Sequence, residues 1–332
     1  MENNNTVNTA NFRRFGILTI VAVYLLILAG GVVRSTGSGM GCPDWPRCFG
    51  RWIPPTDISQ LPADYMIKYK VHGFKAEFNV TKTWIEYINR LMGAIIGILI
   101  FLVVVYSIPF LKKDKAIFYL SLLAFILVGF EAWLGKVVVA TNLSPLMITL
   151  HMSGSLVIVA LLIYVISRSQ TQHITFNIEH KKMVKLFLWF LITLTFIQVI
   201  GGTQVREQID EISSSMNYRQ KETWISQLGS IFVFHRIFSF IVMAANSYFL
   251  FMVSKRTESK NIFIKSAQYS LALLFFEFFL GVALAVFDIP AFIQPLHLLC
   301  ATLIFGLQFF MLVVLYFSTD IKSRISVKME SL

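Results

Sequence analysis

Long runs of apolar residues, separated by short polar segments, dominate the chain. Eight of these runs are long enough to cross a bilayer, which takes about 20 apolar residues in a helix. They lie near residues 15–33, 87–109, 116–139, 146–167, 185–203, 231–253, 266–287 and 294–317. This pattern predicts an all-α membrane protein with eight transmembrane helices.

The composition supports this fold class. Of the 332 residues, 56% are hydrophobic and 14% are charged, and the mean hydropathy is +0.68. A soluble chain of this length needs more charged residues to cover its surface. The net charge of +11 does not indicate binding to nucleic acid, because the basic residues form short clusters between apolar runs and not one basic face.

The basic clusters alternate between the two sides of the predicted bundle. They precede the first run, follow the even-numbered runs and end the chain, whereas the short third and seventh loops contribute only Lys136. By the positive-inside rule, both termini are predicted to be cytoplasmic, and the opposite side is the outer side. Arg13 and Arg14 precede the first run, but no small-residue cleavage site follows it. We therefore predict a retained helix and not a cleaved signal peptide. The longer outer segments are 34–84 and 204–230.

The chain contains an internal repeat at an offset of 146 residues. The matching features are Asn89-Arg90 with His235-Arg236, the Phe-Glu-x-x-Leu-Gly motifs at 130–135 and 276–281, and His151 with His297. At a larger offset, Gly30-Gly31 matches Gly201-Gly202. Such repeats reveal architecture, and both repeats start on the same side. We therefore expect two pseudo-symmetric four-helix bundles, formed by residues 1–168 and 169–332.

Three of the six histidines lie inside predicted helices, near their outer ends. These are His151, His235 and His297, and Asn89 lies at the same depth. The other three fall in predicted loops and are assigned no role: His72, His173 and His180. A single intramembrane histidine is often only an interhelical hydrogen bond, but three costly groups at one level indicate function.

The second half supplies a pair of these histidines. Two histidines that face each other across helices can hold a haem iron from both sides, and His235 and His297 are placed to do so. Zinc requires a third or fourth ligand, and none is obvious nearby. The sequence therefore favours haem.

Four arginines lie near these ligand positions. Arg90 and Arg236 directly follow Asn89 and His235, while Arg34 and Arg206 lie at the outer ends of the first and fifth helices. A guanidinium near the interface binds a haem propionate well, often through two hydrogen bonds. Ordinary anchoring at the membrane interface is the alternative interpretation.

The first half differs from the second. Its ligand position is Asn89, and Glu86 lies three residues earlier on the same helical face, where the second half has Phe232. A carboxylate beside an iron site with one strong ligand, His151, suggests chemistry, whereas a bis-histidine site suggests electron transfer or a structural role. An ion pair between Glu86 and Arg90 is the alternative for this carboxylate.

Two further pairs of residues are candidates for polar roles. Glu131 and Glu277 occur in both halves and are predicted to face the bundle interior, where they bond a haem substituent or a backbone group; a proton relay is a weaker interpretation. Cys42 and Cys48 lie in the outer segment, where a disulfide is permitted. A structural bridge and a redox-active pair both remain open.

The residues described so far resemble those of the bacterial haem A synthases. The resemblance rests on the run GGVVRSTGSGMGCPDWPRCFG at 30–50 and on EYINRLMG at 86–93, which is similar to the Glu-x-x-His-Arg motif of that family. It extends over all eight predicted helices, including the segments from Leu134 to His151 and from Leu280 to His297.

This resemblance implies an oxidoreductase that converts the C8 methyl group of haem O to the formyl group of haem A, by successive hydroxylations and loss of water. It implies a haem b cofactor held by His235 and His297 beside Arg236, and haem O in the first half. The residues implied for haem O are His151 as ligand, Glu86 near the reacting methyl, and Asn89 and Arg90.

The resemblance also implies the location, the role and the partners of the protein. These are a multi-pass location in the bacterial inner membrane, a role in cytochrome oxidase assembly, a haem O synthase as partner, and a cysteine pair that assists haem handling. The sequence does not identify the electron donor, for which a quinone is one candidate. A homo-oligomer is compatible with it.

Asn89 is a departure from the family pattern, which has histidine there. We therefore predict a five-coordinate substrate haem on His151, with Asn89 positioning water or an oxygen species. One rival function is a b-type cytochrome that exchanges electrons with quinone, against which Glu86 and the cysteine pair argue. A second is a proton-relaying transporter, which would show helices broken at mid-span; the relevant prolines lie at helix ends and are Pro145, Pro290 and Pro295.

Overall fold

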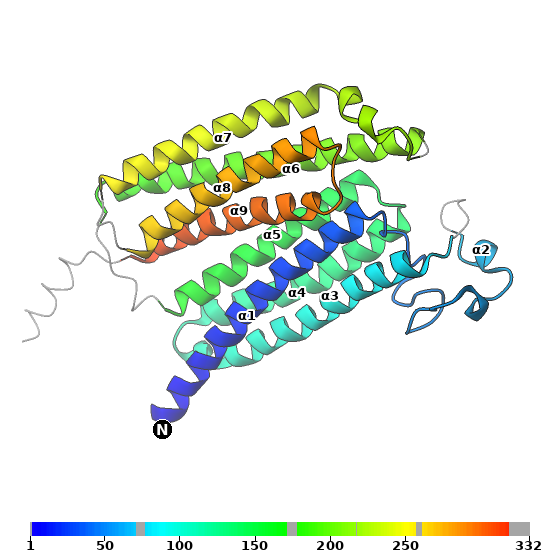
Figure 1. Ribbon diagram of the computed structural model, residues 1–332. Helices are drawn as coiled ribbons and strands as arrows, with labels where there is room; N and C mark the ends of the chain where they lie inside the picture. Colours follow the sequence, from blue (N-terminus) through cyan, green and yellow to red (C-terminus); the bar gives the residue numbers. More distant parts are fainter. Residues whose placement is uncertain (1, 71–76, 171–177, 217, 257–260, 319–332) are drawn as a thin grey trace, which may run out of the picture.

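The computed structural model describes residues 2–70, 77–170, 178–216, 218–256 and 261–318 (Figure 1). The assignments made for His72 and His173, and the basic cluster that ends the chain, lie outside these residues. His180 directly precedes a long helix. The described residues are mostly helical and contain no β-strand.

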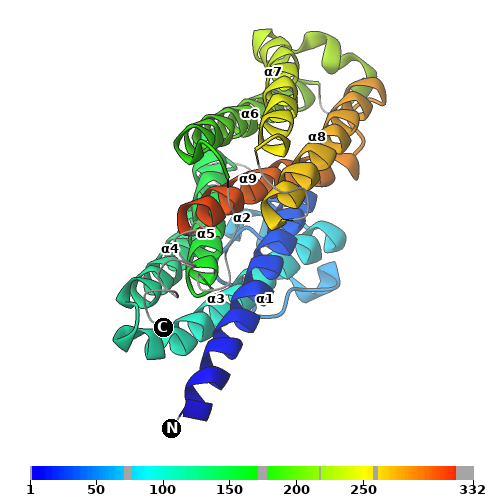
Figure 2. The same cartoon turned by 90° about the vertical axis from the view of Figure 1, so that its left-hand side faces the viewer.

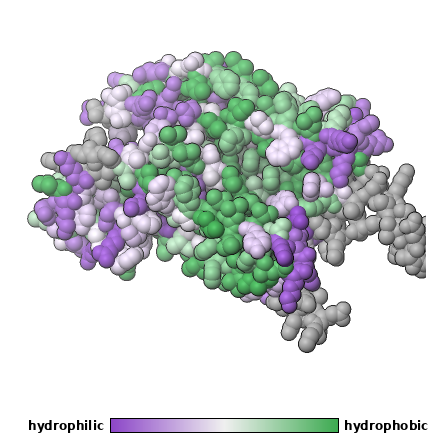
Figure 3. Space-filling model, turned by 180° about the vertical axis from the view of Figure 1, so that it is seen from behind, coloured by the Kyte–Doolittle hydropathy of each residue, from purple (hydrophilic) through white to green (hydrophobic). Residues whose placement is uncertain are grey.

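Eight long helices form the body of the described part of the chain. They are α1 (Glu2–Ser35), α3 (Val80–Ser107), α4 (Lys115–Ala140), α5 (Pro145–Arg168), α6 (Lys181–Ser215), α7 (Ser230–Ser254), α8 (Ile262–Val286) and α9 (Ile293–Phe317). All eight are long and apolar enough to cross a membrane, which confirms the predicted fold class. A broad hydrophobic band separates two hydrophilic ends on the face seen in Figure 3.

The helices are arranged in two groups of four (Figures 1 and 2). In chain order α1, α3, α4 and α5 each pack against the next, and α5 also packs against α1; α6 to α9 follow the same scheme. The two groups meet where α9 packs against α1 and α5. The symmetry between the groups and a boundary after residue 168 stay predictions.

Each group has an apolar interior. In the first group, Ile100, Ala124 and Leu162 are fully buried in one cluster. In the second, a larger cluster includes Phe249 and Met311. Such packing of side chains across helices stabilises bundles inside a membrane, where helix association gains little from the hydrophobic effect.

Two helices extend beyond the predicted spans at the outer side. Helix α6 continues to Ser215, because Val205 and Ile209 bury apolar faces against Trp224 and Ile289. The segment expected as a loop at 204–230 is therefore partly helical, and two short 3-10 turns, η4 (Lys221–Thr223) and η5 (Ile225–Gln227), follow it.

Helix α3 also begins earlier than predicted, at Val80 and not near residue 87. The side chain of Asn79 caps it by accepting a hydrogen bond from the backbone N–H of Lys82 (3.0 Å). Glu86 and Asn89 therefore lie in the second and third turns of the helix. Two other short helical elements are η1 (Ile58–Gln60) and α2 (Tyr65–Lys68) in the outer loop, and η2 (Ile108–Lys112) follows α3.

Candidate functional site

The two histidines of the second half face each other. His235 on α7 and His297 on α9 have ring centroids 6.4 Å apart, with ring planes at 79°. Two imidazoles on opposite sides of one iron, each bound at about 2 Å, have centroids roughly 6 Å apart. His297 Nδ1 lies 3.1 Å from the backbone oxygen of Glu277, a hydrogen bond that leaves Nε2 for a metal. The pair therefore fits a bis-histidine haem.

Glycines make room for these rings. A Cβ at Gly202 on α6 would lie 3.3 Å from His235 Cε1, and one at Gly281 on α8 would lie 3.3 Å from His297 Cε1. Both distances are tighter than ordinary contacts. The glycines of the repeated motifs thus allow two neighbouring helices to approach the ligand positions closely.

The corresponding histidine of the first half lies beside a buried carboxylate. His151 Nδ1 on α5 is 2.7 Å from Glu131 Oε2 on α4, although the two groups are not aligned as a hydrogen bond. Gly154 leaves the space that this carboxylate fills, and Gly135 faces the histidine ring. The side chain of His151 is 45% exposed, in contrast to that of Glu131 at 11%.

Asn89 on α3 occupies the position that matches His235. Its Oδ1 is buried and has no hydrogen-bond partner among the described residues. A Cβ at Gly30 on α1 would lie 4.0 Å from this atom, just as Gly201 on α6 faces His235 at 3.4 Å. Asn89 and His235 therefore each lie against the Gly-Gly motif in the first helix of their own half.

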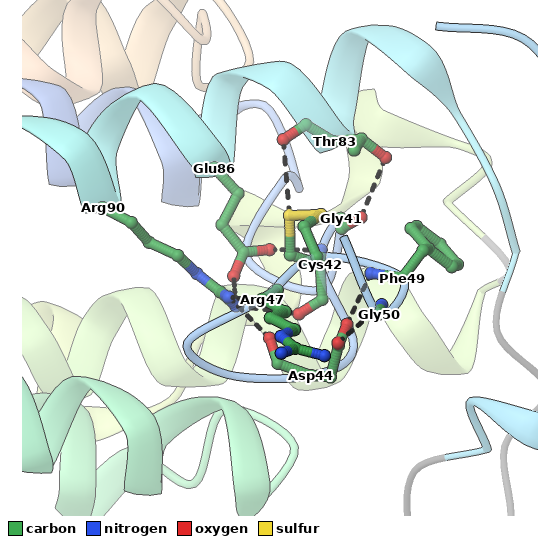
Figure 4. Close-up of a disulfide and its surroundings, with 10 residues drawn as sticks. Gly41, Cys42, Asp44, Arg47, Phe49, Gly50, Thr83, Glu86 and Arg90 are labelled. Atoms are coloured by element: carbon green, nitrogen blue, oxygen red, sulfur yellow. Dashed lines mark hydrogen bonds and ion pairs between the residues drawn. A yellow bond between two sulfur atoms is a disulfide. The ribbon is translucent and has the colours of Figure 1, made fainter. Parts of the chain in front are cut away.

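Glu86 points from α3 toward the outer loop, as Figure 4 shows. Its side chain is buried, accepts a hydrogen bond from the backbone N–H of Cys42 (2.8 Å) and pairs with Arg90 at 2.5 Å. One turn earlier, Thr83 Oγ1 donates to the oxygen of Gly41 (2.8 Å). The ion pair that the sequence left open for Glu86 is present, and both carboxylate oxygens are held.

Arg90 binds the same loop (Figure 4). Its guanidinium donates to the backbone oxygens of Cys42 (2.8 Å), Asp44 (2.6 Å) and Arg47 (3.0 Å). Binding of a propionate by Arg90 stays a prediction, because most of its donors are engaged here. Sequence reasoning missed the anchoring roles of Thr83 and Asp44. An aspartate in a proline-rich turn is a weak signal for such a role.

Cys42 and Cys48 form a disulfide, which the outer position of the pair permitted. Both cysteines are fully buried and pack with Phe49 and Tyr65 in the interior of the loop. The carboxylate of Asp44 closes the turn by accepting the backbone N–H groups of Phe49 and Gly50. The disulfide thus belongs to a small packed unit that Glu86 and Arg90 attach to α3.

The three other arginines differ in their partners. Arg34 on α1 and Arg206 on α6 both pair with Asp210, at 3.1 Å and 2.8 Å. Asp210 therefore joins the first helices of the two halves. Its spacing of four residues from Arg206 predicts that ion pair, but nothing in the sequence predicts the ion pair with Arg34. Arg236 is exposed, lies 5.7 Å from the centroid of the Phe232 ring, and has no ion pair within the described part of the chain.

Comparison with known proteins identifies similar chains. The family model COX15-CtaA, described as cytochrome oxidase assembly protein, matches residues 13–309. The heme A synthase of Alkalihalophilus pseudofirmus is 23% identical over 91% of this chain and 96% of its own length. Those of Shewanella oneidensis (29% identical, 47% of this chain and 45% of that protein) and Shouchella clausii (26%, 58% of each) match shorter regions.

Proposed function

Because this chain belongs to the COX15-CtaA family of cytochrome oxidase assembly proteins, we propose that it is a haem A synthase that oxidises the C8 methyl group of haem O to a formyl group. The relative from Alkalihalophilus pseudofirmus, which matches along nearly its whole length, carries the name heme A synthase and supports a role in haem A synthesis. Two successive hydroxylations would each replace a C–H bond of the methyl group by C–OH at the expense of an external oxidant, and the resulting geminal diol would lose water to give the formyl group.

The facing pair His235 and His297 is the observation that carries this proposal. Its 6.4 Å separation would allow both imidazoles to hold one haem iron, and the adjacent glycines leave the rings room. Haem b bound there supplies one-electron transfer. Arg236 is exposed beside His235 and free of ion pairs among the described side chains, so it is the residue we assign to a propionate.

The first half is the proposed site for haem O. His151 is accessible and provides one strong ligand, while Asn89 Oδ1 is a weak ligand but a good acceptor for water. The substrate is therefore five-coordinate in this proposal. Glu86, fixed by the Cys42 N–H and by Arg90, is the carboxylate we assign to the reacting methyl side.

Haem analysis tests this proposal. The chain is expressed in a bacterial host that makes haem O but not haem A, and the extracted haem is separated by chromatography. Haem A or its hydroxylated intermediate is the expected product, and the His151→Ala variant is expected to yield haem O alone. Unchanged haem O together with a reducible b-type spectrum from the wild-type chain would instead identify an electron-transferring cytochrome.

A further inference from the structure

The proposed function gives no role to Glu131, a buried carboxylate in the first half. Glu131 on α4 is 8% exposed, and its Oε2 lies 2.7 Å from Nδ1 of His151 on α5. Both atoms are buried and have no hydrogen-bond partner among the described residues. An acidic group inside a membrane-spanning helix is costly and marks function by default. Its contact with His151 points to a role at that histidine.

The distance between these two atoms is already that of a hydrogen bond. An N–H group and a carboxylate oxygen that are hydrogen-bonded lie about 2.7–2.9 Å apart. Only the direction differs here, and the torsion of a histidine ring about its Cβ–Cγ bond is broad. The side chain of His151 is 45% exposed, so packing does not lock the ring. A small rotation therefore lets Nδ1–H donate to Glu131 without any movement of the helices.

Gly154 makes the place that this carboxylate occupies. It lies on α5, three residues after His151 and on the same face of the helix. A Cβ at Gly154 would overlap Oε1 of Glu131 and lie 2.8 Å from its Cδ. Even the smallest side chain at this position would therefore displace the carboxylate from His151.

The matching residues of the second half make a different bond. At the offset of 146 residues they are Glu277, His297 and Cys300. His297 Nδ1 lies 3.1 Å from the backbone oxygen of Glu277, and the carboxylate takes no part in that bond. Cys300 is 5% exposed and has a side chain where the first half has glycine. The same motif therefore presents a backbone oxygen to one histidine and a carboxylate to the other.

We propose that Glu131 is a positioning residue for His151, whose Nδ1–H it accepts, so that Nε2 is left as the atom that binds iron. This role rests on the proposed function, which makes His151 the ligand of haem O. Such an acceptor fixes the tautomer and the ring orientation of a ligating histidine and strengthens it as a donor. A carboxylate does so more strongly than a backbone oxygen, because the hydrogen bond is charge-assisted. The histidine of the reacting haem is therefore the stronger donor, and Gly154 permits this difference.

Resonance Raman spectroscopy of the reduced, haem-loaded full chain tests this role. A five-coordinate haem O on His151 gives an iron–histidine stretching band, which a six-coordinate haem between His235 and His297 does not give. The band therefore reports the first half alone. Glu131→Gln, whose amide oxygen is a weaker acceptor, is expected to shift it to lower frequency and to weaken haem O binding roughly 10- to 100-fold. A merely structural contact between α4 and α5 would not move this band.

Gly154→Ala is a second variant that changes neither polar group. Its Cβ displaces the carboxylate, so the band is expected to shift in the same direction as in Glu131→Gln. Glu277→Gln is the matched control in the second half, and it is expected to leave the band at its wild-type frequency, because His297 bonds a backbone oxygen. The b-type absorption spectrum of the second half shows that each variant is folded.

A band that Glu131→Gln leaves unmoved, in a chain with an intact b-type spectrum, would overturn this role and leave the proposed function standing. An equal shift in Glu277→Gln would also overturn it, since the effect would then not come from the contact with His151. A wild-type chain without the band, or a band that persists in His151→Ala, would instead refute His151 as the ligand of haem O, and the role of Glu131 would fall with it.

Discussion

The two halves share a helix scheme but differ at the positions that we assign to haem. The second half places His235 and His297 on opposite sides of one gap, whereas the first half has Asn89 and an accessible His151 beside Glu131. A site with two strong ligands holds iron without an open position, and a site with one leaves room for reaction. Under the proposed function, this difference assigns the cofactor to the second half and the reaction to the first.

The residues at the outer ends of the two halves also differ. Over the first half, a disulfide-closed loop is held by Glu86 and Arg90. In the second half, Phe232 replaces the carboxylate and Arg236 is exposed. The first half therefore has an outer loop that a buried carboxylate holds to its second helix, and the matching position of the second half has no carboxylate.

Replacing one histidine in each half is expected to have the largest effects on haem binding and on haem A formation. His297→Ala is expected to abolish the b-type absorption spectrum of the purified protein, because a lone His235 does not hold the haem from both sides. His151→Ala is expected to keep that spectrum and to lose haem A formation. His180→Ala, outside the proposed sites, is the control. Loss of the cofactor spectrum in His151→Ala would show that the roles of the halves are assigned wrongly.

Glu86→Gln tests whether the cover over the first half takes part in chemistry. The amide still accepts the Cys42 N–H but carries no charge, so the loop keeps its place while haem A formation falls by roughly 10²-fold or more. Thr83→Val is the matched control, because it removes a different contact between α3 and the loop. Equal losses in both variants would mean that Glu86 only holds the loop.

Asn89→His makes the first half more similar to the second. A second strong ligand is expected to convert bound haem O from a five-coordinate high-spin to a six-coordinate low-spin state, seen by electron paramagnetic resonance, and to slow haem A formation several-fold. Asn89→Gln, which keeps an amide, serves for comparison. Faster conversion by the histidine variant would contradict the five-coordinate substrate.

Alanine at the matched positions Gly135 and Gly281 is expected to have the smallest effect on haem binding. At Gly281 the new Cβ would lie 3.3 Å from His297 Cε1, so crowding is expected to cost about 1 kcal/mol of haem binding, measured by haem titration. At Gly135 the distance to His151 Cε1 is 3.8 Å, an ordinary contact. Gly135→Ala is therefore expected to leave haem binding unchanged and to stabilise the helix by about 0.5–1 kcal/mol in thermal unfolding. A reversed order would mean that the rings move when haem binds.

The sequence alone determined the fold class and the candidate ligand positions along the chain. Apolar runs of bilayer length leave few alternatives to transmembrane helices, because the membrane interior forces backbone groups to bond within a helix. The 146-residue offset also identified His151, His235, His297 and Asn89, since a repeat places equivalent residues at equivalent positions of a bundle.

The tertiary structure alone decided which partner each polar group has. The sequence treated Arg90 as a haem contact and did not connect Arg34 with Asp210, because both interactions join segments far apart in the chain. Likewise, the hydrogen bond from Gln308 Nε2 to Asn246 Oδ1 (3.1 Å) joins α9 to α7. A hydrogen bond depends on a few ångströms of distance and on direction, so its presence or absence is fixed only when the helices pack.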